Sequence, residues 1–198
     1  MSLLISRRLL VASGLAAWAT SGFAAPRRYD LVPGRSRVAF IFNVSGTQQT
    51  GTVPVQSADI RVDPGNLAAS SANVTSDIRL AKTGMLFVTQ ALLSASVLDA
   101  DTHPLVRYES TKIILGQSGR ISEGARIDGR LTLRGITRPL QLAATLTRPA
   151  GSAANDLSIL NIQLNGTLSR RAFGAVGYPK LVDDPVDLDI RAKIRARG

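Results

Sequence analysis

Apolar and polar residues alternate with a period of two along most of this chain, and no other feature constrains the fold as much. The segment 186–197 shows the pattern most clearly, because apolar residues occupy its even positions and charged residues its odd positions. Successive side chains of a β-strand point to opposite faces, so this period predicts half-buried strands. The same alternation recurs, with differing regularity, in the segments 37–44, 53–62, 73–80, 105–115 and 157–168.

The segment Gly129–Arg148 contains two further strands and predicts a hairpin with its corner at residues 135–139, Gly-Ile-Thr-Arg-Pro. Near Gln56 and Ser57 the phase of the alternation slips by one residue, which predicts a bulge. Together the patterns predict an all-β chain of roughly eight strands, most about ten residues long. Such strands favour a closed eight-stranded antiparallel barrel, because closure removes the exposed edges of the sheet.

One segment departs from the period of two. Within residues 83–98, Met85, Val88, Leu92 and Ala95 fall on one stripe of a helix, which predicts a short amphipathic helix. In a barrel of this size such a helix can cap one end.

The first 24 residues have the composition of an export signal. Ser6-Arg7-Arg8 precedes an apolar run of small residues, and Gly22-Phe23-Ala24 offers a cleavage site before Ala25. The arginine pair fits both a general secretory signal and a twin-arginine signal, so both routes stay open. We therefore expect a mature domain of residues 25–198 that leaves the cytoplasm.

Composition argues against several kinds of chemistry. The chain has no cysteine and a single histidine, His103, which lies beside Asp99 and Asp101 in a stretch that a turn before Pro104 explains. Asp183-Asp184 likewise precedes a strand and is typical of a turn. Without a nucleophile, base and orienting acid in one pattern, or ligands at metal-binding spacing, we expect no catalytic residue, no metal site and no enzyme activity.

The net charge is +10, and loss of Arg7 and Arg8 with the leader leaves +8 on the mature chain. Basic charge steers a protein toward polyanions, which outside the cytoplasm include anionic lipid head groups. The arginines are spread over the whole chain, and aromatic residues make up only 5% of it. That composition argues against a stacking surface for nucleic acid.

The predicted barrel interior carries mostly Val, Ala, Leu, Ser and Gly and few rings. An eight-stranded barrel has room either for its own side chains or for one slender ligand. Inward residues of modest volume favour a cavity, and an apolar cavity favours an apolar ligand.

Three stretches resemble the YceI-like family of exported, polyisoprenoid-binding, lipocalin-like bacterial proteins. They are YDLVPGRSRVAFIFNVSGTQQTGTV, IDGRLTLRGITRPLQLAATL and LSRRAFGAVGYPKLVDDPVDLDIRAKI. The resemblance covers about residues 29–197, and its most specific motifs are G-x-L-T-x-R-G-I-T-R-P and S-R-R-x-F-G. It implies a lipocalin-like barrel in the periplasm whose lumen holds a long isoprenoid chain, typically of a quinone or a polyprenol.

The chain departs from the family in its predicted helix. Family members usually carry Arg-Asp-x-His-Leu and then Asp-Phe-Phe-Asp there. This chain has Met-Leu-Phe-Val-Thr-Gln-Ala-Leu-Leu at 85–93, without the charged and histidine positions, and Val97-Leu98 in place of the two phenylalanines. The polar contacts of those family residues do not carry over, and we expect a more apolar mouth.

Our first hypothesis is an exported carrier that holds a polyisoprenoid or isoprenoid quinone in the barrel lumen and needs no other cofactor. The residues predicted to line the ligand site are Val38, Phe40, Phe42, Ile78, Phe87, Leu92, Leu142, Leu164, Phe173 and Ile190.

A second hypothesis is a stress-response or interaction module with a filled barrel. Its basic outer face, including Arg191, Lys193 and Arg195, would bind an anionic membrane or another acidic surface. An outer-membrane barrel is disfavoured, because the charged face of the last strand would meet lipid if the apolar side faced inward, and aromatic girdles are lacking. Whether two chains form a homodimer is left open.

Overall fold

The structure is a computed structural model that describes residues 26–116, 123–153 and 155–197, so the predicted leader, residues 1–24, lies outside the described residues. Eleven strands form one sheet: β1 Arg27–Leu31, β2 Arg37–Val44, β3 Thr47–Val53, β4 Val55–Val62, β5 Ser71–Asp77, β6 Lys82–Thr83, β7 Leu105–Leu115, β8 Ala125–Leu133, β9 Ile136–Thr147, β10 Ile159–Ser169 and β11 Pro185–Ala196. The helix α1 spans Leu86–Leu93, and short 3-10 turns span Leu67–Ala69 (η1), Ile78–Leu80 (η2) and Arg171–Phe173 (η4).

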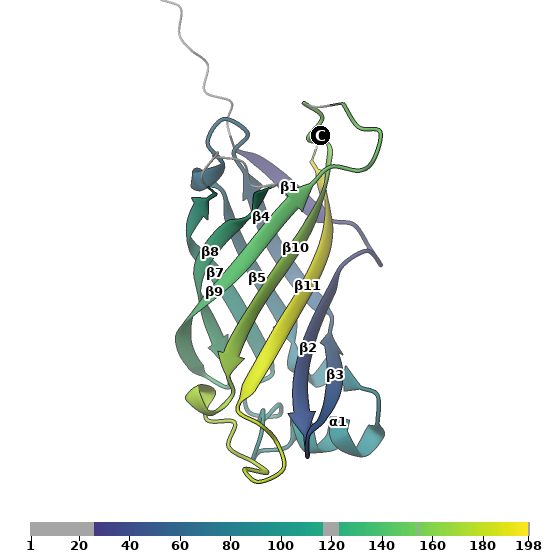
Figure 1. The fold of residues 1–198 in the computed structure, drawn as a ribbon, viewed down its shortest axis with the longest axis vertical. Helices are drawn as coiled ribbons and strands as arrows, with labels where there is room; N and C mark the ends of the chain where they lie inside the picture. The colour runs from purple at the N-terminus through teal and green to yellow at the C-terminus, as the bar shows by residue number, and fades with distance from the viewer. Residues whose placement is uncertain (1–25, 117–122, 154, 198) are drawn as a thin grey trace, which may run out of the picture.

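The sheet closes on itself as an antiparallel barrel (Figure 1). Its ring of eight strands runs β1-β4-β5-β7-β8-β9-β10-β11, and pairing of β1 with β11 completes it. Strand β11 pairs with β1 near its C-terminus and with β2 nearer its N-terminus, so β1 and β2 act as one long strand interrupted at residues 32–36. The predicted eight-stranded antiparallel barrel is confirmed.

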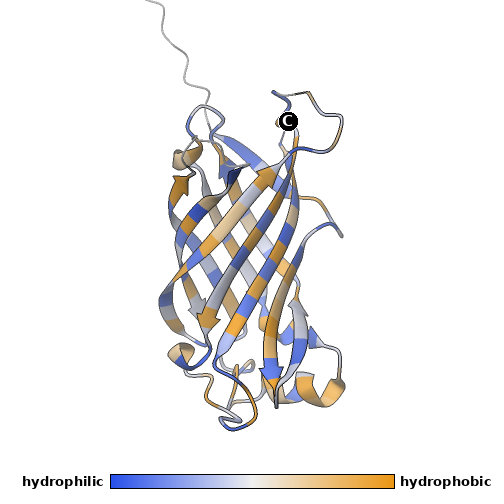
Figure 2. Cartoon of the chain, viewed as in Figure 1, coloured by the Kyte–Doolittle hydropathy of each residue, from blue (hydrophilic) through white to orange (hydrophobic). Residues whose placement is uncertain are grey.

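The register between strands places the apolar residues of neighbouring strands on the same side of the sheet. Val38 lies opposite Ile190 and Phe40 opposite Leu188, whereas Arg37 lies opposite Arg191. Because facing residues of paired strands share a side of the sheet, apolar pairs meet inside the barrel and charged pairs outside. Figure 2 shows the resulting alternation of hydrophobic and hydrophilic bands along the strands.

The predicted bulge is confirmed, because the pairing of β4 with β5 shifts register between Val55 and Ser57. The predicted corner of the β8–β9 hairpin is wrong. The chain turns at Arg134 and Gly135, which have positive φ values of 52° and 72° and match a tight two-residue turn. Pro139 lies inside β9, where this half of the strand pairs with β8 alone, so its missing N–H costs no bond to β10.

The segments before and around the helix also differ from expectation. The strand predicted at 73–80 ends at Asp77, whose carboxylate accepts a hydrogen bond from the Arg79 amide (3.0 Å) and begins a 3-10 turn. The helix predicted within 83–98 is shorter, because Ser94 ends it. The Ser94 hydroxyl donates to the Ala91 carbonyl (2.7 Å), which is how serine competes with helical hydrogen bonding.

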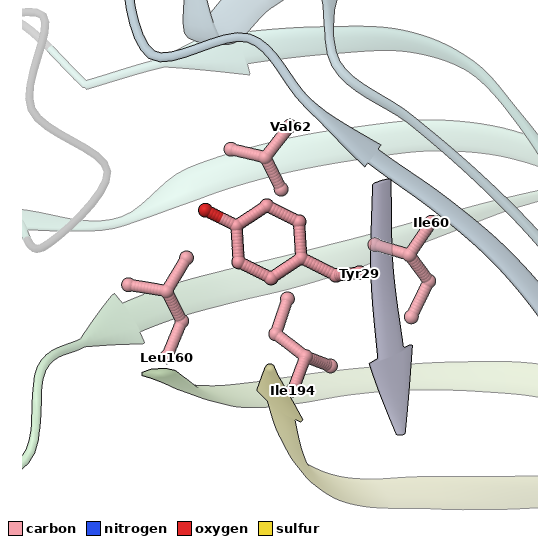
Figure 3. Close-up of a cluster of buried hydrophobic side chains, with 5 residues drawn as sticks. All are labelled: Tyr29, Ile60, Val62, Leu160 and Ile194. Atoms are coloured by element: carbon pink, nitrogen blue, oxygen red, sulfur yellow. The ribbon is translucent and has the colours of Figure 1, made fainter. Parts of the chain in front are cut away.

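A cluster of five buried side chains closes one end of the barrel, where β1, β4, β10 and β11 meet. It comprises Tyr29, Ile60, Val62, Leu160 and Ile194. Figure 3 shows the Tyr29 ring among the other four side chains, and its hydroxyl donates to the Leu157 carbonyl at 2.8 Å. We call this the closed end. Helix α1, the β8–β9 turn and the β10–β11 connection lie at the opposite end (Figure 1).

Gly129 tests the packing of the wall. A Cβ atom there would lie 2.7 Å from the Glu109 carbonyl oxygen and would overlap the Tyr108 ring, so Gly129→Ala must displace backbone. We expect it to lower the free energy of unfolding by about 1–3 kcal/mol, measured by urea denaturation. Gly84→Ala is the control, since nothing lies within 4 Å of a Cβ at that position. Equal midpoints for the two variants would contradict this account.

Candidate functional site

The barrel encloses a cavity of about 590 Å³. Its wall consists of the inward residues of the strands, joined at one end by side chains of α1 and of the segment 175–182. Along β11 the apolar lining residues are Val186, Leu188, Ile190 and Ala192, a span of about 20 Å at about 3.3 Å per residue, and Arg191 also borders the cavity. The cavity is therefore elongated and almost entirely apolar, and its volume lies within the range of about 300–1,000 Å³ typical of ligand pockets.

Nine of the ten residues predicted to line a ligand site lie on this wall: Val38, Phe40, Phe42, Ile78, Phe87, Leu92, Leu142, Leu164 and Ile190. Phe173 does not. It follows β10 in the turn η4, is 2% exposed, and packs into a cluster with Leu131, Leu140 and Leu142. Contact of the nine residues with a ligand stays a prediction.

Glycine in a neighbouring strand makes room for two rings along the wall. Phe40 lies opposite Gly51, and a Cβ at Gly51 would overlap the Phe40 ring. Tyr108 lies over Gly129 in the same way. Because the rings occupy space that a larger neighbour would fill, they lie toward the wall and leave the lumen open. Phe40 also stacks on Phe42, with ring centroids 6.0 Å apart.

Several lining residues escaped the sequence analysis, among them Val74, Val106, Ile127, Leu131 and Leu188. For most of them the signal was present, since they occupy the apolar positions of alternating strands. What the pattern could not supply is which inward residues face empty space and which fill the clusters at the ends.

Tyr108 is one of the few polar groups on the wall. Its hydroxyl donates to the Ile127 carbonyl at 3.3 Å, and burial, with a smaller contribution from Asp128, raises its pKa to about 12. The hydroxyl therefore stays protonated at neutral pH, and Tyr108 adds a neutral polar group to an apolar chamber.

The cavity opens at the end opposite the Tyr29 cluster. Phe87 of α1 is 67% exposed, and Tyr178 and Leu181 of the β10–β11 connection are 45% and 50% exposed, yet all three also line the cavity. Side chains that touch both solvent and the interior mark the opening. We call this opening, between α1 and the segment 176–182, the mouth.

Comparison with known proteins agrees with this architecture. Residues 29–194 match the model of the YceI-like domain. This chain belongs to the YceI-like family. A UPF0312 protein of Vibrio vulnificus is 27% identical over 179 residues, which cover 82% of this chain and 93% of that protein.

Two solved structures share the YceI-like barrel. BcnA of Burkholderia cenocepacia superposes with a TM-score of 0.72 at 18% identity, over 83% of this chain and 99% of its own. A polyisoprenoid binding domain from Saccharophagus degradans superposes with a TM-score of 0.60 at 12% identity, over 86% of this chain and 99% of its own. At sequence identities this low, the two superpositions establish the shared fold alone.

The two motifs that resemble the YceI-like family meet at the mouth end. Arg134 of the first motif donates to the carbonyls of Gly174 (2.6 Å) and Ala95 (2.8 Å). Arg138 adds a longer bond to the Ala172 carbonyl at 3.4 Å. The first motif therefore joins the S-R-R-x-F-G turn to the segment after α1, so both motifs serve to build the mouth.

Arg170 of the second motif holds the loop that follows it. Its side chain is buried, and its guanidinium donates to the carbonyls of Ala175, Gly177 (2.9 Å), Val182 (2.8 Å) and Asp183 (2.9 Å). Burial lowers the pKa of Arg170 from its usual value, but a guanidinium stays charged at any physiological pH. One cation thus satisfies four carbonyls and shapes the β10–β11 side of the mouth.

The other candidate residues of the sequence analysis lie in turns. His103 lies 4.0 Å from Asp99 (Nε2 to Oδ2) beside the β8–β9 turn, and the Asp184 carboxylate accepts the Arg171 amide at 2.9 Å. Neither His103 nor Asp184 lines the cavity. Residues 26–116, 123–153 and 155–197 contain no group of three or more His, Asp or Glu placed to hold a metal ion. None of their helices has the length and apolar character needed to cross a bilayer.

Replacing Arg170 tests whether the mouth depends on it. Arg170→Met leaves four carbonyls without their donor, and we expect a loss of about 3 kcal/mol in the free energy of unfolding, measured in urea. Arg171→Met is the matched control, since its side chain is 53% exposed, and should change stability by less than about 0.5 kcal/mol. Similar losses for both variants would refute the assigned role.

Tyr108 makes stability depend on pH in the alkaline range. An unfolded tyrosine loses its proton near pH 10 and folded Tyr108 near pH 12, so the folded state is favoured below pH 10 and loses this advantage as pH rises through 12. We expect the Tyr108→Phe variant to show a smaller fall in unfolding free energy across that range than the unaltered protein. Identical pH profiles would contradict the burial of this hydroxyl.

Proposed function

We propose that this protein binds a long apolar molecule, an isoprenoid lipid or isoprenoid quinone, in the barrel and carries it outside the cytoplasm. The observation that carries the proposal is the elongated apolar cavity, which is sealed by the Tyr29 cluster at one end and open at the mouth. The likeness in fold to a domain described as polyisoprenoid binding supports the same class of ligand.

The wall suits a hydrocarbon chain more than a compact polar ligand. Each buried methylene contributes about 0.8 kcal/mol, so ten of them supply about 8 kcal/mol without any polar contact. The hydroxyls of Ser76 and Tyr108 add polar points on this wall. Binding of this kind requires no covalent step, and the protein would act as a carrier and not as an enzyme.

Export and delivery in the periplasm belong to the same proposal. The support is the leader-like composition of residues 1–24, together with the resemblance to exported family members. Separation of periplasmic from cytoplasmic fractions, with detection of the chain's mature N-terminus, tests this part directly.

The competing hypothesis requires a barrel filled by its own side chains. The cavity of about 590 Å³ in the lumen argues against it. Its proposed surface is also partly neutralised. On the outer face of β11, Arg191 pairs with Asp189 at 3.4 Å.

The direct test is organic extraction of the purified protein followed by mass spectrometry, together with titration by a long-tailed isoprenoid quinone and by its tail-less head group. We expect an extracted isoprenoid and binding that requires the tail. A clean extract combined with no uptake of the long-tailed quinone would overturn the proposal.

A variant that narrows the lumen sharpens this test. Val74 lines the cavity without belonging to the buried clusters, so Val74→Phe adds a ring to the empty space. We expect at least about a tenfold weaker affinity for the long-tailed quinone, since a few displaced methylenes account for that factor. Asn73→Phe adds the same ring on the exposed side of β5 and should leave affinity unchanged. Equal affinities for the two variants would place the ligand outside the lumen.

A further inference from the structure

Exposed apolar side chains gather at one end of this barrel. Among the described residues, the large hydrophobic side chains that are more than a third exposed are Leu80, Met85, Leu86, Phe87, Ile136, Val176, Tyr178 and Leu181. They belong to η2, to α1 and the residue before it, to β9 where it leaves the β8–β9 turn, and to the β10–β11 connection. In Figure 1, α1, the β8–β9 turn and the β10–β11 connection lie at the mouth end, and η2 leads through β6 into α1. A cluster of this kind marks a binding surface more often than a random scatter does.

Hydrogen bonds hold these segments next to one another. The Gly177 amide donates to the Ser96 carbonyl at 2.7 Å, which ties the β10–β11 connection to the residues after α1. The Ser45 amide donates to the Leu181 carbonyl at 2.7 Å, which ties the same connection to the β2–β3 turn. The β10–β11 connection is therefore held beside the residues after α1 and beside the β2–β3 turn, around the opening. We call the eight residues the mouth face.

Within the two segments that carry most of the mouth face, the charged residues have one sign. The segments 78–98 and 171–182 hold seven of its eight residues and contain Arg79, Lys82, Arg171 and Lys180 but no aspartate or glutamate. An apolar surface ringed by cations complements a bilayer that carries anionic head groups, because the apolar groups enter the acyl boundary while the cations meet phosphates.

The carboxylates that flank these segments are engaged within the fold. Asp77 pairs with Arg79 at 2.6 Å, Asp99 accepts the Thr102 hydroxyl at 2.9 Å, and Asp183 accepts the Asn43 amide at 3.2 Å. None of them belongs to the mouth face.

We propose that the mouth face docks onto a lipid bilayer containing anionic lipids, so that the barrel opens toward the acyl chains. Continuity with the cavity favours a bilayer over a protein partner. Phe87, Tyr178 and Leu181 belong to the mouth face and also line the cavity, so a lipid leaving the bilayer would enter the barrel along apolar side chains. Docking itself does not depend on which ligand the barrel holds; its purpose, loading and unloading, rests on the proposed function.

Two residues of the mouth face permit a clean test. Leu86 and Val176 are 75% and 56% exposed and do not line the cavity, so replacing both by serine should disturb neither the fold nor the ligand site. We expect the unaltered protein to float with vesicles of phosphatidylglycerol and phosphatidylethanolamine and to bind phosphatidylcholine vesicles at least tenfold more weakly. The Leu86→Ser, Val176→Ser variant should bind the anionic vesicles at least tenfold more weakly while keeping its affinity for long-tailed quinone added from solution.

Charge variants separate this surface from the basic outer face of β11. Lys82→Gln with Lys180→Gln should weaken binding to anionic vesicles and reduce its dependence on salt. Lys193→Ala with Arg195→Ala, on the outer face and away from the cavity, should change vesicle binding less than twofold. The reverse order of effects would assign membrane binding to the outer face and overturn the proposal.

Failure of docking and failure of ligand binding give different results. Val74→Phe should lose quinone affinity and keep vesicle binding, whereas the Leu86→Ser, Val176→Ser variant should do the opposite. No binding of the unaltered protein to anionic vesicles would overturn the docking proposal alone. So would sedimentation showing that the mouth face joins two copies of the chain and that the serine variant merely separates them.

Discussion

The closure of the barrel through the short strand β1 is the interaction on which the remaining structure depends. Residues 27–31 pair with β4 on one side and with β11 on the other, and Tyr29 lies in both ladders. Without this strand, β4 and β11 would each present an unpaired edge and the inward apolar faces would open to water. The same strand supplies Tyr29, the centre of the cluster that seals the closed end. Strand β1 therefore both closes the ring of strands and supplies the central side chain of the cluster that closes one end of the barrel.

Because the ring is closed and one end is sealed, the other end is built from loops. At this end, arginine side chains satisfy backbone carbonyls that no strand pairing satisfies. Arg134 and Arg170 donate to backbone carbonyls of the segments around the mouth. Loop carbonyls that turn away from water need donors, and a guanidinium supplies several from a single side chain. The backbone around the mouth is therefore held by hydrogen bonds, while its exposed side chains are apolar. An opening of this construction suits transfer of an apolar molecule better than selection of a polar one.

Some elements followed from local sequence alone, and others did not. The limits 105–115 of β7 and the bulge near Ser57 agree with the sequence prediction, although β7 itself also shifts register against β8 between Ser110 and Lys112. The β8–β9 corner was misplaced because Pro139 is a strong turn signal, yet it lies where β9 has no neighbour on one side. Phe173 was predicted to line the lumen. The turn η4 carries it into the cluster with Leu140, a change of direction that periodicity does not encode.

By itself the sequence determined which side chains share a face, because a period of two leaves a strand only one way to bury its apolar half. It thereby determined an all-β barrel with an apolar inner wall. Only the tertiary structure decided that this wall encloses empty space, since the volume depends on glycines such as Gly51 lying beneath rings of neighbouring strands. Only the tertiary structure brought α1 and the segment 176–182, far apart in the chain, to one opening. Long-range pairing sets both outcomes, and pairing depends on strand order and register, which no local pattern contains.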